Sequence, residues 1–381
     1  MDNNSQKHPL SPKKIALFVL YALIAVFLLL TVLSFNDLPG IIEQLKTVDT
    51  GYVLLGVLMV IIYLALFPVS LCLLAKANKI NASMPMIYTI GMIEHFFNGI
   101  TPLATGGQPF QAHAFTKAKV KLGESTGLLM TNLLLFMIAT NGLSVAALLC
   151  FDSLTSSIDS FWYPIIIIGY TLNLLLLAIT FTLAISRKVR NGLLRFIHFI
   201  SRRRPFKKLQ NHENYLRVYF EQVQQSVLHL IHNKKYFFVA LFTKVLSYCC
   251  LYGSAYFILL SMGVPVTPAH IPLIILGTSF AITAVGFIPT PGASGGVEGA
   301  AGQIYNSIIL LVSGGALAAT SETMANSVML IWRLLSYYFV MLVSLLFYIG
   351  LEIYFNRKKA KEEAPESASA ESVTDKSDTT D

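Results

Sequence analysis

The chain has 381 residues, of which 55% are hydrophobic and only 13% are charged, and its mean hydropathy is +0.63. Soluble domains carry about 25% charged residues, so this composition excludes a soluble globular protein and indicates a polytopic membrane protein. The four cysteines lie in apolar segments without a Cys-x-x-Cys pair, which indicates neither a zinc site nor a disulfide framework.

Charge is distributed unevenly along the chain. The net charge is +8, but residues 360–381 contain seven acidic residues and two lysines, a net of −5, which leaves +13 for the remainder. The composition of this end, rich in Ser, Ala and Glu and free of aromatic residues, predicts that residues 357–381 form a disordered acidic tail.

The first half of the chain predicts three membrane spans. Residues 1–14 are polar and end in two lysines, and the apolar stretch 15–35 that follows lacks a small-residue cleavage site. We therefore expect an uncleaved helix whose N-terminus is cytoplasmic by the positive-inside rule. Further spans at 51–75 and 125–150 flank an interrupted apolar segment at 84–117, and together they make a first membrane repeat over residues 15–150.

The second half, residues 161–354, repeats this order. It has spans at 161–185, 236–262 and 322–354 and an interrupted segment at 271–312. Lysines at both ends of the first interrupted segment place these ends in the cytoplasm, and the second segment has no cationic residue, which places its ends outside. We predict an all-α inverted-topology repeat of six full spans plus two re-entrant helical hairpins, in the cell membrane with both termini cytoplasmic.

The segment that joins the two repeats, residues 186–235, contains twelve Lys or Arg against two Glu and is expected to be cytoplasmic. Apolar residues recur at helical spacing between Val189 and Ile200 and are flanked by basic residues. A basic amphipathic helix of this kind lies at an anionic leaflet, where it binds lipid head groups. It could serve as a topology signal and surface anchor or recognise a specific lipid.

The two interrupted segments share a pattern of glycine and proline. The first has Gly99-x-x-Pro102 followed by Gly106-Gly107, and the second has Gly286-x-x-Pro289 followed by Gly295-Gly296. The apolar halves of the first are shorter than the roughly 20 residues of a spanning helix, so the chain is expected to turn back. Paired breaks of this kind in two halves of a membrane protein point to a transporter binding site.

The helices that restart after each break suggest an anion site. Irregular backbone at membrane depth requires a polar interior, and helix N-termini present N–H groups and a positive dipole end to an anion such as a lipid phosphate. Alternatively, these N–H groups are capped and only close a turn, and Thr105 with Gln108 fits a capping box.

Ionisable residues at depth add to this pattern. Arg333 lies about 16 Å into the last span at 1.5 Å per residue, close to the midplane, and is predicted to pair with Glu298 or with a substrate phosphate. Lys244 lies about 12 Å into its span and is predicted to extend toward the membrane surface.

The predicted substrate-binding residues are the glycines of the two breaks and the polar side chains near them: Glu94, His95, Asn98, Thr105, Gly106, Gly107, Gln108, Gln111, Gly295, Gly296, Glu298 and Arg333. We expect no catalytic residues, metal site or cofactor, because the sequence has no nucleotide-binding, serine-hydrolase or zinc-protease motif.

Two stretches, FFNGITPLATGGQPFQAHAF and GFIPTPGASGGVEGAA, with the basic segment between them, resemble the transmembrane domain of the lysylphosphatidylglycerol synthase (multiple peptide resistance factor) family. The resemblance covers roughly residues 13–357. It implies movement of aminoacylated phosphatidylglycerol between leaflets; in the two-part members, a further cytosolic domain transfers lysine from lysyl-tRNA. Only 24 residues follow Arg357, so the resemblance implies the flippase part alone.

Three hypotheses follow. The first is a flippase for an anionic or aminoacylated phospholipid, or for another lipid-linked substrate, with Arg333 facing phosphate and Glu94 and Glu298 facing an amino group. The second is a phosphatidylglycerol lysyltransferase that acts alone or with a soluble partner; only this one involves a nucleic acid, lysyl-tRNA. The third is a membrane scaffold. The sequence leaves open which lipid is moved and whether the chain forms a homodimer.

Overall fold

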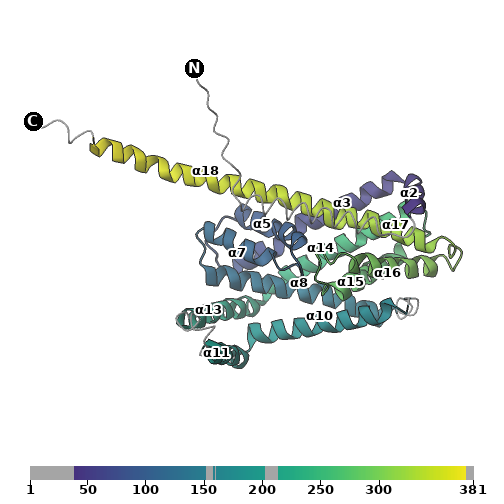
Figure 1. Ribbon diagram of the computed structural model, residues 1–381, viewed down its shortest axis with the longest axis horizontal. Helices are drawn as coiled ribbons and strands as arrows, with labels where there is room; N and C mark the ends of the chain where they lie inside the picture. Colours follow the sequence, from purple (N-terminus) through teal and green to yellow (C-terminus); the bar gives the residue numbers. More distant parts are fainter. Residues whose placement is uncertain (1–37, 152–157, 159, 202–212, 375–381) are drawn as a thin grey trace, which may run out of the picture.

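The computed structural model describes residues 38–151, 158, 160–201 and 213–374, and the elements in these ranges are all helices (Figure 1). Among the described residues, six helices are long and apolar enough to cross a membrane. The chain is therefore an all-α polytopic membrane protein, as its composition predicts.

Five of these six helices correspond to predicted spans: Thr50–Ala77, Leu122–Cys150, Trp162–Thr182, Lys234–Ser261 and Ser321–Lys358. The predicted N-terminal segment 1–14 and the first predicted span, 15–35, lie outside the described residues. The sixth helix, Pro268–Val285, falls in the predicted second hairpin. It gains its length because a 3-10 turn, η2 (Pro268–His270), precedes α15 (Ile271–Val285). The chain then turns and returns in α16 (Gly296–Val312), which packs along α15, so this segment is a hairpin.

The first hairpin consists of α5 (Met84–Met92), α6 (Glu94–Ile100) and α7 (Gly107–Lys117), and α7 packs against both of the others. Before it, the second predicted span bends at Pro68, between α3 (Thr50–Leu66) and α4 (Val69–Ala77). A proline inside a helix removes one backbone hydrogen bond and kinks it. Gly91 allows α5 to approach this kink, since a Cβ there would lie 2.7 Å from the Cβ of Pro68.

The packing of the two hairpins follows one rule. The returning limb of each lies on the last span of its own half: α7 on α8 (Leu122–Cys150), and α16 on α17 (Ser321–Arg333). The first limb lies on the last span of the other half: α15 on α8, and α5 and α6 on α18 (Val340–Thr374). This reciprocal arrangement is what a two-fold relation between the halves requires.

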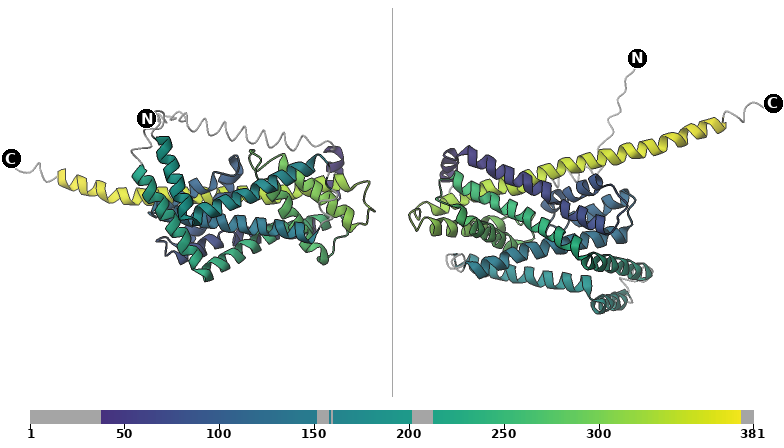
Figure 2. Two further views of the ribbon diagram at one scale, coloured as in Figure 1. Left: turned by 90° about the horizontal axis from the view of Figure 1, so that it is seen from below. Right: turned by 180° about the vertical axis from the view of Figure 1, so that it is seen from behind.

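The remaining helices complete the bundle. α14 (Lys234–Ser261) packs along α3 and α4, and α10 (Trp162–Ile185) packs along α15. α2 (Leu38–Lys46) contacts α17 at one end of the bundle, whereas α11 (Arg187–Ser201) lies toward the other end (Figure 2).

The segment between the halves is more closely integrated than a loop. α13 (Glu213–His232) packs on α8, where a Cβ at Gly127 would overlap Ser226. Asn78 Nδ2 donates a hydrogen bond of 2.7 Å to Ser226 Oγ, which ties α13 to the end of α4. The predicted basic amphipathic helix is present as α11, and α13 joins it to the membrane core.

The last span is one long helix with an irregular middle. A π-helical stretch, η3 (Leu334–Phe339), separates α17 from α18. Such stretches are often found at functional sites. α18 extends well past the bundle (Figure 1), and it continues to Thr374, although residues 357–381 are predicted to be disordered. The Lys, Ala and Glu residues just after Arg357 are strong helix formers and prolong the apolar helix that precedes them.

Candidate functional site

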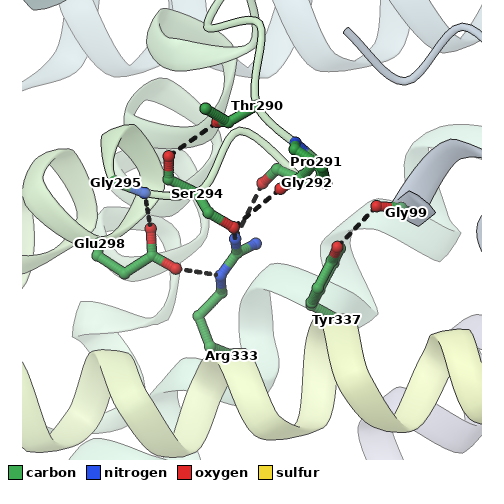
Figure 3. Close-up of polar contacts among 9 residues, drawn as sticks. All are labelled: Gly99, Thr290, Pro291, Gly292, Ser294, Gly295, Glu298, Arg333 and Tyr337. Atoms are coloured by element: carbon green, nitrogen blue, oxygen red, sulfur yellow. Dashed lines mark hydrogen bonds and ion pairs between the residues drawn. The ribbon is translucent and has the colours of Figure 1, made fainter. Parts of the chain in front are cut away.

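The tips of the two hairpins meet inside the bundle. Pro102 in the first break and Pro291 in the second form an isolated antiparallel β-bridge. The hydroxyl of Tyr337, in η3, donates a hydrogen bond of 2.8 Å to the carbonyl oxygen of Gly99 (Figure 3). The two regions of irregular backbone thus share one place, as the paired glycine and proline motifs predict.

A cavity of about 550 Å³ lies at this meeting point. Both breaks contribute to its wall, together with side chains from α6, α8, α10, α14, α15, α16 and α17. Most of these side chains are apolar or aromatic, and the polar groups among them are few and dispersed: Glu94, His95, Asn98, Thr105, Gln108, Thr140, Asn173, Thr180, Thr283, Arg333 and Ser336. A cavity of this size and composition is typical of a binding site for a small molecule or a head group.

Arg333 holds the second break in place. Its Nε donates a hydrogen bond of 2.9 Å to Glu298 Oε1, and its Nη2 donates bonds of 2.9 Å to the Gly292 carbonyl oxygen and 3.3 Å to Ser294 Oγ (Figure 3). The other carboxylate oxygen of Glu298 accepts the N–H of Gly295. Glu298 thus caps the N-terminus of α16 and neutralises Arg333, which is only 6% exposed. The predicted pair of Arg333 with Glu298 is present.

The guanidinium of Arg333 is not fully used. Its Cζ lies 4.5 Å from the centroid of the Tyr337 ring, which orients the group by a cation–π contact. Among the described residues the hydrogen bonds of Arg333 come from Nε and Nη2 and none comes from Nη1, and Arg333 forms part of the cavity wall. Since each terminal nitrogen has two N–H groups, Arg333 can hold Glu298 and still donate to an anion in the cavity. The two predicted partners of Arg333, Glu298 and a phosphate, are therefore compatible with each other.

The first break is closed by its own side chains. The N–H of Gly106 donates to Thr101 Oγ1 at 2.9 Å, and the N–H of Gly107 donates to Asn98 Oδ1 at 2.8 Å. The N-terminus of α7 is therefore capped, which is the alternative to an anion site at these amides. The predicted capping box is wrong in its residues, because the Thr105 hydroxyl donates instead to the Pro102 carbonyl oxygen. The threonine that takes part in the cap is Thr101, four residues before Thr105.

Glu94, at the start of α6, is 8% exposed and forms part of the cavity wall. Gln111 Nε2, on α7, donates to its carboxylate at 3.4 Å and to the Ile90 carbonyl oxygen at 3.0 Å. His95, the next residue, lies with its ring centroid 4.1 Å from that of Phe67, and its Nε2 lies 3.4 Å from the Tyr63 hydroxyl. This wall of the cavity combines one carboxylate with aromatic rings.

Lys244 does not extend to the membrane surface, so that prediction is wrong. It is fully buried, and its Nζ lies 3.3 Å from the Phe67 carbonyl oxygen and 3.8 Å from the centroid of the Phe67 ring. It also interacts electrostatically with Glu94. The bend at Pro68 explains the difference, because it directs the carbonyl group of Phe67 toward α14 and gives the ammonium group a partner at depth.

Residues 15–344 match the family described as the lysylphosphatidylglycerol synthase TM region. The chain belongs to this family. A comparison with individual curated proteins gave no significant match. The cavity and the two hairpins lie within the residues that match the lysylphosphatidylglycerol synthase TM region.

In this family member the structure separates the predicted site residues into two groups. Those that form the cavity wall are Glu94, His95, Asn98, Thr105, Gln108 and Arg333. The others lie behind the wall and shape it: Gly106, Gly107, Gln111, Gly295, Gly296 and Glu298. Sequence reasoning missed Asn173 and Tyr337, which also form the wall. Tyr337 lies one helical turn after Arg333, and that spacing is a signal that could have identified it.

Proposed function

We propose that this protein translocates a phospholipid between the two leaflets, and that the lipid has an anionic or aminoacylated head group, as lysylphosphatidylglycerol does, or is another lipid-linked anion. The observation that carries the proposal is the cavity of about 550 Å³ at the meeting point of two broken hairpins, with Arg333 and Glu94 in its wall. Its size suits a head group, while acyl chains would stay in the surrounding lipid.

The charged groups suggest how a head group binds. Arg333 has an Nη1 donor that no described residue uses and that suits a phosphate oxygen, and Glu94 supplies a carboxylate that suits an ammonium group. Glu94 is on the first hairpin and Arg333 is on α17, so the two groups come from different halves of the protein. A substrate that carries both charges would therefore contact both halves, and rearrangement of one half against the other would carry it across.

The same proposal includes the location. Cationic residues concentrate at the end of the bundle with α11 and α13, which supports the proposal that this end faces the cytoplasm in a cell membrane and that both termini are cytoplasmic. We expect α11 to bind anionic head groups there, since its apolar and basic residues have amphipathic spacing.

Translocation can be measured directly in liposomes. Purified protein is reconstituted with a trace of fluorescent phosphatidylglycerol or fluorescent lysylphosphatidylglycerol, and a membrane-impermeant quencher reports how fast label from the inner leaflet becomes accessible. We expect wild-type protein to expose the inner-leaflet label faster than protein-free liposomes do, and Arg333→Gln to reduce the rate at least tenfold. Glu352→Gln is the matched control, since Glu352 pairs with Lys117 on the surface, away from the cavity.

Equal rates with and without wild-type protein would contradict the proposal. A parallel sample with lysyl-tRNA and unlabelled phosphatidylglycerol, analysed by mass spectrometry, tests the alternative function. Formation of lysylphosphatidylglycerol there would identify a lysyltransferase instead. If Arg333→Gln translocates lipid as fast as wild type does, the cavity is not the pathway.

A further inference from the structure

Glu94 and Lys244 form a second charged site, separate from Arg333, which is the residue proposed to bind phosphate. Lys244, on α14, has 0% exposure, and its one hydrogen bond within the described residues goes to the Phe67 carbonyl oxygen at 3.3 Å. An ammonium group has three donors, and its burial requires a counter-charge. Glu94 supplies this charge through space. Because Glu94 also forms part of the cavity wall, the counter-charge of Lys244 is accessible to whatever enters the cavity.

A second observation points to a missing hydrogen-bond donor beside Glu94. Gln111 is fully buried, and its Oε1 has no hydrogen-bond partner among the described residues, whereas its Nε2 donates to Glu94 Oε2 and to the Ile90 carbonyl oxygen. A buried acceptor without a donor destabilises the folded protein. A proton on the carboxyl group of Glu94 would supply an O–H donor next to this amide.

We propose that Glu94 binds a proton in the transport cycle and thereby couples lipid translocation to a transmembrane proton gradient. The inference rests on the proposed function, because it uses the same cavity. In one state Glu94 is a carboxylate that interacts electrostatically with Lys244; in the other it has taken up one proton from cavity water, forming one O–H bond that can donate to Gln111 Oε1. A cationic head group and a proton compete for the same carboxylate, so loading one releases the other.

A proton suits this site better than a metal cation. Sodium and larger cations require several oxygen ligands, whereas Glu94 is accompanied by an ammonium group and the side-chain amides of Gln111 and Asn98. Within the described part of the chain no three His, Cys, Asp or Glu side chains cluster closely enough to hold a metal ion.

The groups around Glu94 limit what else could titrate. On its own helix it has His95; from α14 it is faced by Lys244 and Tyr248, and from α3 by Tyr63. α7 contributes only the uncharged Gln111. His95 is the one neighbour that ordinarily titrates near neutral pH, so it needs its own control variant.

The test uses the full chain in the same liposomes, with no pH gradient, with the interior more acidic, and with the interior more alkaline. We expect the wild-type rate to change several-fold with the direction of the gradient. Glu94→Gln should respond to neither direction, Glu94→Asp should retain the response at a lower rate, and His95→Gln should retain it. A wild-type rate that is the same in all three conditions would overturn the coupling while leaving translocation established.

A second measurement does not require transport. Infrared spectra of the detergent-solubilised protein at a series of pH values should show the carbonyl band of a protonated carboxylic acid that is absent from Glu94→Gln and present in Glu352→Gln. Absence of the band in wild type throughout the neutral range would also overturn the inference. If translocation follows a sodium gradient and ignores the proton gradient, the site binds sodium instead, and the assignment to a proton is wrong.

Discussion

The two broken hairpins solve the same problem with different groups. In both, a helix stops inside the bundle, the chain makes an irregular turn, and a second helix starts with glycine. The first break is capped from within its own hairpin by Thr101 and Asn98. The second is capped by Glu298 and held by Arg333, which comes from a different element, α17.

This difference determines how each break can move. The first is a self-contained unit, whereas the position of the second depends on α17 and on the π-helical stretch that follows Arg333. Since Tyr337 in that stretch also contacts Gly99 of the first break, α17 and η3 link both hairpins. We infer that a shift of the last span would alter the second break first and reach the first break through Tyr337.

Reversal of the charge at Arg333 should have the largest effect. Arg333→Glu places two carboxylates together where the side chains are 7% and 12% exposed, and removes three hydrogen bonds. Loss of one partner from a buried ion pair costs about 3–5 kcal/mol, so we expect poor folding and no transport. Thermal unfolding in detergent and the liposome assay measure the two effects.

The double variant Arg333→Glu with Glu298→Arg separates structure from function. It restores an opposite-charge pair and should recover part of the lost melting temperature. It should not recover transport, because the group that faces the cavity is then a carboxylate and no longer suits phosphate. Recovery of both would show that Arg333 serves only to join α16 to α17.

Alanine at Gly107, the first residue of α7, and at Gly295, the residue before α16, should destabilise the protein to an intermediate extent, for a different reason at each position. At Gly107 a Cβ would lie 2.6 Å from Asn98 Oδ1 and 2.8 Å from Glu94 Cγ, so it would displace two residues of the cavity wall. Overpacking of this kind costs about 1–3 kcal/mol. At Gly295 a Cβ meets no atom within 4 Å, but φ is +88°, so the cost is backbone strain, about 1–3 kcal/mol.

These two variants are each other's control. Both should lower the unfolding temperature by a similar amount, but Gly107→Ala should reduce the rate of lipid translocation more, because only it moves Asn98 and Glu94 directly. Equal loss of transport in the two variants, at equal stability, would mean that the first break has no special role in binding.

Much of this architecture could be predicted from the sequence because the deciding signals are local. Spans follow from hydropathy, and breaks follow from clusters of glycine and proline. The Arg333–Glu298 pair could also be anticipated, since a charge at the midplane must find one of the few opposite charges at similar depth. Each of these constraints follows from hydropathy, composition and the depth of a charge, without knowledge of how the segments pack.

The remaining features depend on the packing between segments. The choice of Thr101 over Thr105 as a cap depends on the path of a turn that hydropathy does not encode. The burial of Lys244 depends on a carbonyl group that a kink in another helix, 177 positions away, directs toward it. The π-helical stretch is likewise a response to packing, since nothing in the composition of LLSYYF distinguishes it from ordinary helix.

The smallest expected effect comes from the link between the two breaks. Tyr337→Phe removes the hydroxyl that donates to the Gly99 carbonyl oxygen at 2.8 Å but keeps the aromatic ring beside Arg333. One hydrogen bond contributes about 0.5–1.5 kcal/mol, so stability should fall by that amount. If α17 and η3 coordinate the two hairpins, this variant should also alter the dependence of translocation on Arg333.

Tyr338→Phe, which removes a hydroxyl from the next position, is the matched control. A double-mutant cycle that combines each tyrosine change with Arg333→Lys measures the coupling: an interaction energy in the Tyr337 cycle, and none in the Tyr338 cycle, is what a shared linkage through η3 requires. Two cycles with the same result would mean that the first break responds to its own caps alone.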